Sequence, residues 1–190
     1  MRFQVLSLIG HGPHPLTGRT PSPADRFGDV LAQAEAAERL GLGTFAVGSA
    51  TSPRSPELAA LHDPAGAYVG AGSGGLLIAD TDADAVARYK EVHEAQVRQS
   101  FKPALVGRAG YNTPYRTIEE AMADGPQLIG SPERIIDKLL GYHAVYGHDL
   151  QSVTVDGFGL ERAEQLAQLE RFAEEIAPVV RREAPTTLWG

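Results

Sequence analysis

The sequence contains no cysteine, and it has few basic residues and no long apolar run. Without cysteine the chain can form no disulfide, no thiolate metal site and no cysteine nucleophile, as is common in a reducing cytoplasm. Its 17 lysines and arginines are outnumbered by 24 acidic residues, so the formal net charge is −7. This balance gives no electrostatic reason to bind nucleic acid or an anionic membrane. We therefore expect neither as a partner.

The apolar segment 3–9 is too short to cross a bilayer, and it is interrupted by Gln4 and Ser7. It also lacks the small-residue cleavage site that follows a signal peptide. We expect it to form a strand in a cytoplasmic protein. The chain of 190 residues, 43% of them hydrophobic, is long enough to bury the core of one domain.

Strand and helix patterns alternate, which predicts an α/β fold. In residues 1–48 a strand precedes a helix with Ser22 as N-cap, Pro23 in its first turn and Gly41 at its end, and a second strand follows at 44–47. This is a βαβ unit with parallel strands. The residues expected on the buried face of its helix are Phe27, Val30, Leu31, Ala34, Ala37 and Leu40.

Residues 49–64 are rich in serine and proline, and we interpret them as a linker. The remaining part, 65–190, contains further strand and helix patterns. The strands are expected at 76–79 and 151–155, and the helices at 82–100, 117–125, 131–147 and from 162 to about Pro178, which bends or ends the last one. The count of strands is then about four.

Gly70, Gly72 and Gly75 have the G-x-G-x-x-G spacing of a dinucleotide-binding loop. That loop works only where a helix begins directly after the glycines. Here an apolar run follows Gly75, and the helix pattern begins only after Asp80. We therefore interpret the glycines as part of a strand or bulge.

The loop after the first strand contains His11, His14 and Arg19. In a parallel α/β fold, loops at the carboxyl ends of strands form the binding site, so these residues are candidates for ligand contact. The alternative is that they are ordinary loop residues. His143 is expected to pack on a helix face, and the His148-Asp149 pair falls in a turn at the opposite end of the strands.

Three segments resemble the bacterial luciferase-like flavin monooxygenases: LTGRTPSPADRFGDVLAQAEAAERLGLGTFAVG at 16–48, and the stretches at 62–93 and 128–183. The resemblance implies a (β/α)8 barrel that uses reduced FMN or a deazaflavin to oxidise a small organic substrate, without a metal. If the chain is such an enzyme, we expect His11 and His14 to be its catalytic residues. The expected cofactor-binding residues are Gly10, Ser49, Ser73, Asp156 and Gly157.

The chain also departs from that family. A (β/α)8 barrel needs about 250 residues and eight strands, and the middle of the barrel is absent here. The family's acid and histidines after the second strand are missing at 48–52, which read Gly-Ser-Ala-Thr-Ser. We therefore expect an incomplete TIM-barrel-like fold, completed or covered in a homodimer, because an open edge of apolar strands pairs readily with other chains.

Three functions remain open at this point. The first is a flavin-dependent monooxygenase or oxidoreductase. The second is a non-catalytic or flavin-independent descendant that binds a small molecule. The third is a subunit that serves dimerisation or interaction with another protein.

Overall fold

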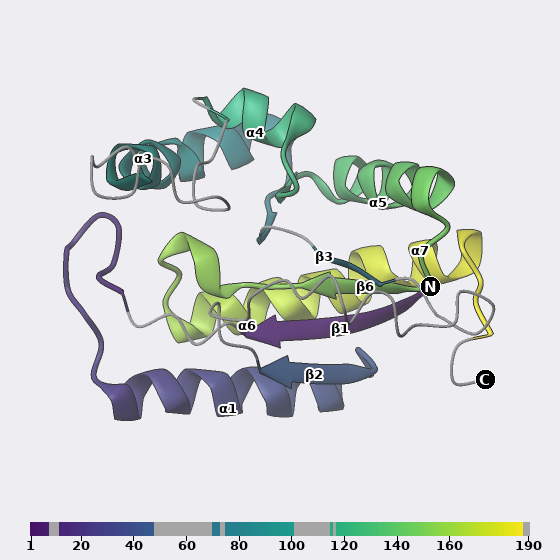
Figure 1. Cartoon of the computed structure of the whole chain (residues 1–190), viewed down its shortest axis with the longest axis horizontal. Helices are drawn as coiled ribbons and strands as arrows, with labels where there is room; N and C mark the ends of the chain where they lie inside the picture. The colour runs from purple at the N-terminus through teal and green to yellow at the C-terminus, as the bar shows by residue number, and fades with distance from the viewer. Residues whose placement is uncertain (8–11, 48–69, 73–74, 101–114, 116, 188–190) are drawn as a thin grey trace, which may run out of the picture.

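A computed structural model describes residues 1–7, 12–47, 70–72, 75–100, 115 and 117–187, and all structural statements below concern these residues. The linker expected at 49–64 lies outside them. The elements, shown in Figure 1, are β1 (Arg2–Ser7), α1 (Pro23–Arg39), β2 (Thr44–Val47), β3 (Gly70–Gly72), β4 (Leu76–Ile78), α3 (Asp82–Ser100), α4 (Ile118–Asp124), β5 (Leu128–Gly130), α5 (Pro132–Tyr146), β6 (Leu150–Val153), η1 (Asp156–Phe158), α6 (Arg162–Arg171), η2 (Phe172–Ile176) and α7 (Ala177–Glu183).

The strands are parallel and form open sheets, so the α/β prediction is confirmed and no barrel closes in the described structure. One sheet has the order β2-β1-β6-β3, and β4 pairs with β5. A backbone hydrogen bond from Leu76 N to Thr154 O joins β4 to the segment that follows β6. Helix α1 lies along β2 in Figure 1, and α6 lies behind the strands in this view.

Buried and half-buried residues alternate along β1, and the buried ones face the larger hydrophobic core. Phe3 and Val5 are fully buried, whereas Gln4 and Leu6 on the other face are half-buried. Phe3 meets Phe172 edge-on, with 5.0 Å between ring centroids. The core thus joins the central strand to the C-terminal helical segment. None of the helices in the described part of the chain combines the length and apolarity needed to cross a membrane.

The helix ends follow the predicted capping chemistry. The hydroxyls of Ser22, Thr117 and Ser131 each accept a hydrogen bond from a backbone N–H in the first turn of their helix. Gly147 ends α5 in the left-handed conformation, with φ at 58°. These boundaries are confirmed because each depends on atoms within a few residues of the cap.

The predicted buried face of α1 is partly wrong. Phe27 and Leu31 are 57% and 64% exposed, while Arg26 and Gln33 are buried in the positions that face the sheet. Apolar periodicity alone misplaces the face because two polar side chains on it bond to a buried carboxylate, described below. Val30 and Ala37 are buried as expected.

The expected count of four strands is also too low. Leu128–Gly130 forms β5, a three-residue strand too short to show an alternating pattern, and Gly70–Gly72 forms β3. The strand interpretation of the glycine segment is confirmed, because β4 follows it and helix α3 begins only at Asp82. The last helix is interrupted by a π-helical segment, η2, just before Pro178, which lacks a backbone N–H.

Gln168 of α6 completes the edge of β4 where β6 has ended. Its side-chain amide is fixed from both ends, because its Oε1 accepts from Ile78 N and its Nε2 donates to Ile78 O at 3.2 Å. All of these atoms are buried. A side chain therefore substitutes for a neighbouring strand at this position, and α6 is fastened to the sheet by polar contacts as well as apolar ones.

We predict that Gln168→Leu destabilises the fold by about 1–3 kcal/mol, since it leaves the buried N–H of Ile78 without an acceptor. The C=O of Ile78 keeps a second donor, Arg171 Nη1, at 3.5 Å. Urea unfolding followed by circular dichroism measures this change. Glu174→Leu, at an exposed position of the following turn, is the control and should change the free energy of unfolding by less than about 0.5 kcal/mol. Equal stability of the two variants would contradict the role given to Gln168.

Candidate functional site

A pocket of about 760 Å³ opens at the carboxyl ends of β1 and β6. Its walls come from the loop 12–21, the first turns of α1 and the segment 156–165 that leads into α6. Parallel α/β proteins bind ligands at this edge, because the loops that leave the strands converge there. The described part of the loop after β1, residues 12–21, borders this cavity, whose volume is that of a small-molecule site. Contact of this loop with a ligand stays a prediction.

Asp156 anchors one side of the pocket. Its carboxylate pairs with Arg26 at 2.9 Å, accepts the hydroxyl hydrogen of Ser7 at 2.6 Å and accepts from Gln33 Nε2 at 2.8 Å. The same Gln33 amide group donates to Gln165 Oε1 at 2.7 Å. The ion pair is nearly enclosed, with side chains 8% and 11% exposed. Together, the ion pair and these hydrogen bonds join β1, α1, η1 and α6 at the pocket.

His14 folds the pocket loop onto the segment after η1. Its Nε2 bonds to the carbonyl oxygen of Gly159 at 2.8 Å, and its Nδ1 accepts from the backbone N–H groups of Leu16 and Thr17. A Cβ at Gly159 would lie 2.9 Å from Nε2, and φ there is 68°, so this position requires glycine. Both ring nitrogens of His14 are thus engaged within the protein.

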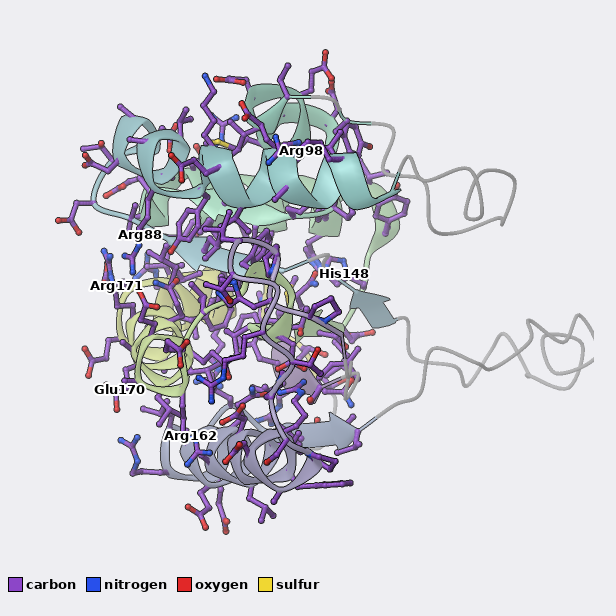
Figure 2. All side chains as sticks on the ribbon, turned by 90° about the vertical axis from the view of Figure 1, so that its left-hand side faces the viewer. Arg88, Arg98, His148, Arg162, Glu170 and Arg171 are labelled. Atoms are coloured by element: carbon purple, nitrogen blue, oxygen red, sulfur yellow. The ribbon has the colours of Figure 1, made fainter. Side chains whose placement is uncertain are left out.

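Charged side chains line the pocket in compensated pairs. Arg162 Nε bonds to Asp29 at 2.7 Å across the α1–α6 contact, and Arg26 pairs with Asp156. Figure 2 shows Arg162 beside α1, below Glu170 and Arg171 of the same helical segment. Asp25 accepts the Ser22 hydroxyl hydrogen, which lowers the pKa of its carboxyl, and the charge of Arg19 contributes in the same direction.

The residues predicted from the sequence divide into two groups. Asp156 and Gly157 lie in η1 at the carboxyl edge, and His14 and Arg19 line the pocket. The others lie outside the described residues: Gly10, His11, Ser49 and Ser73. The segment 48–52, where the family's acid and histidines are missing, also lies outside them.

Ser7, Arg26, Gln33 and Gln165 were not identified from the sequence. Two of them, Arg26 and Gln33, are polar residues seven positions apart on α1, and this spacing places them on one helix face. A polar pair within an apolar helix face was the available signal. Its partner could not be found from spacing, because Asp156 is far away in the chain.

His143 and His148 lie away from the pocket. His143 Nδ1 bonds to the backbone oxygen of His148 at 2.9 Å, and fully buried His148 bonds through Nε2 to Gln151 at 3.0 Å. Asp149 instead accepts from Thr186, so the adjacent His148 and Asp149 form no acid–base pair. This agrees with the expectation that neighbouring residues seldom point together.

Lys138 of α5 has a lowered pKa, about 8, because its ammonium group is half-buried. It donates to the carbonyl oxygens of Met122 and Gln127, both at 2.9 Å, and so holds the end of α4. It does not line the pocket. Among the described residues, no three His, Asp or Glu side chains converge in a way that could hold a metal ion.

No protein-family model matches the chain, and a search of curated proteins finds no significant match.

We predict that Asp156→Asn destabilises the protein by about 3–5 kcal/mol, because it removes one partner of a nearly enclosed ion pair. Chemical denaturation measures the loss. Asp29→Asn is the matched control: it breaks the more exposed pair with Arg162 and should cost no more than about 1 kcal/mol. The same small loss in both variants would show that the Asp156 pair does not hold the site together.

Acid should destabilise the protein through His148. Burial lowers the pKa of this imidazole below its ordinary value of 6.5, and its Nδ1 is buried without a partner. The unfolded chain therefore takes up a proton first, and stability falls as the pH drops through about 6.5. We expect His148→Gln to flatten this fall between pH 7.5 and 5.5 in urea unfolding series. An unaltered pH dependence would contradict the prediction.

Proposed function

We propose that the chain is a shortened luciferase-like flavin-dependent oxidoreductase that binds a flavin and a small organic substrate in the pocket at the carboxyl edge. In this proposal β1, β2 and β6 correspond to the first, second and last strands of a TIM-like barrel whose middle is absent. The observation that carries the proposal is the position of the pocket. It is built from the segments 12–21 and 156–165, most of which fall inside the sequence blocks that resemble the family.

The lining of the pocket suits the ring system of a flavin. Its volume of about 760 Å³ lies within the range of small-molecule sites, and Pro13, Pro15 and Leu160 supply apolar surface. When bound, a reduced flavin supplies the electrons for oxygen chemistry. The chain's own contribution is to hold the ligand against the Asp156 cluster and to exclude water.

A second function is favoured by His14. Because both of its ring nitrogens already bond within the protein, it is not available as a base toward a ligand in this arrangement. Its catalytic role, like that of His11, stays a prediction. A flavin-independent protein that binds a small molecule in the same pocket needs no such base.

Binding of flavins tests the proposal. We expect saturable quenching of the fluorescence of riboflavin, FMN or a deazaflavin at micromolar concentration. Thr17→Trp, which places an indole in the pocket from its exposed rim, should weaken binding at least tenfold. Val145→Trp, exposed on α5, should have no effect. Absence of quenching by all three compounds would remove the flavin proposal and favour the second function.

Oxygen consumption separates the two functions once binding is found. If the protein is an oxidoreductase, a mixture of protein and reduced flavin consumes oxygen faster than the same concentration of free reduced flavin does. A protein that binds without such consumption is the non-catalytic form.

We also propose that the chain forms a homodimer through the outer side of β2 and α1. In the described structure β2 is an end strand of its sheet, and Val47 at its end is exposed. Helix α1 contacts α6 through the flank that bears Asp29. Because residues advance by about 100° along a helix, Phe27 and Leu31 lie on the opposite flank. A two-fold axis brings this single surface against its own copy.

Light scattering coupled to size-exclusion chromatography measures the mass. We expect a dimer for the native chain and a monomer for the variant with Phe27→Lys and Leu31→Lys. Val145→Lys, at another exposed apolar position, should remain dimeric. A native monomer at high micromolar concentration would refute the dimer and leave the pocket proposal unchanged.

A further inference from the structure

The charged residues that line the pocket indicate which class of ligand it binds. This inference rests on the proposed function. Among the described residues, three arginines and four acids line the pocket. Arg26 and Arg162 are ion-paired with Asp156 and Asp29. The other charged side chains of the described lining are Arg19, Asp25 and Glu161, and the charge of Arg19 contributes to the lowered pKa of Asp25. Acids therefore outnumber arginines by one in this lining.

The two helix N-termini at the pocket offer few free donors to an anion. In α1, Pro23 has no N–H, and the N–H of Asp25 is taken by Ser22 Oγ at 3.1 Å. In α6 the Glu161 side chain accepts from a backbone N–H in a capping box with Glu164. The Ser22 hydroxyl in α1 and the Glu161 carboxylate in α6 therefore occupy places where a phosphate oxygen would bind at a helix start.

We infer that the pocket holds an uncharged organic group and that its described lining provides no phosphate subsite. A phosphate dianion placed in it would meet a lining of net negative formal charge, whereas a neutral ring system meets the apolar surface of Pro13, Pro15 and Leu160. A flavin is therefore recognised through its ring and ribityl chain. The expected selectivity is that riboflavin binds at least as tightly as FMN, although FMN carries the additional phosphate.

Calorimetric titration of the native protein with riboflavin and with FMN tests the selectivity. A riboflavin affinity equal to or above that of FMN supports the inference. FMN binding that is tenfold tighter overturns it and leaves the proposed flavin function intact. Binding of neither compound overturns the proposed function instead.

One variant and its control test whether the acidic lining causes the expected selectivity between riboflavin and FMN. Asp25→Asn removes one negative charge from the pocket lining, and it should improve FMN affinity relative to riboflavin roughly two- to fivefold. Asp84→Asn is the matched control, because Asp84 accepts the Thr81 hydroxyl hydrogen in the same way at the start of α3, away from the pocket. It should leave the ratio unchanged. An unchanged ratio in Asp25→Asn would refute the electrostatic explanation.

Thermal unfolding in the presence of inorganic phosphate tests the absence of a phosphate subsite without any flavin. Inorganic phosphate, compared with chloride at equal ionic strength, should not raise the melting temperature of the native protein. A rise that disappears in Arg19→Gln would demonstrate a phosphate subsite and overturn the inference.

Discussion

The enclosed carboxylate of Asp156 is the constraint on which the pocket depends. A charge removed from water needs both a counter-charge and hydrogen-bond donors, and Asp156 obtains them from Arg26, Ser7 and Gln33. These donors belong to β1 and α1, while the acid follows β6. The first and last parts of the chain are therefore held together at the edge where the cavity opens.

The same need for partners explains the divided sheet. Strand β6 ends too early to bond with the whole of β4, and the amide of Gln168 bonds to Ile78 in its place. Apolar burial then continues on both sides of this contact, through the core around Phe3 and the smaller cluster around Tyr89. An open arrangement can thus satisfy buried backbone groups without closing a barrel.

Several polar side chains of the pocket lining bond to other groups of the protein. Arg26 and Arg162 are held in ion pairs, and His14 is bonded to Gly159. In the described lining these side chains are therefore already engaged within the protein, beside the apolar surface of Pro13, Pro15 and Leu160.

The sequence by itself determined the α/β class, the order of most elements and the helix boundaries, because caps such as Ser22, Thr117 and Gly147 act within a single turn. It also placed His14, Arg19, Asp156 and Gly157 near the ends of strands. Only the tertiary structure decided which face of α1 is buried and which side chains surround Asp156. Those contacts join residues more than a hundred positions apart, and no local periodicity carries information about a partner at that distance.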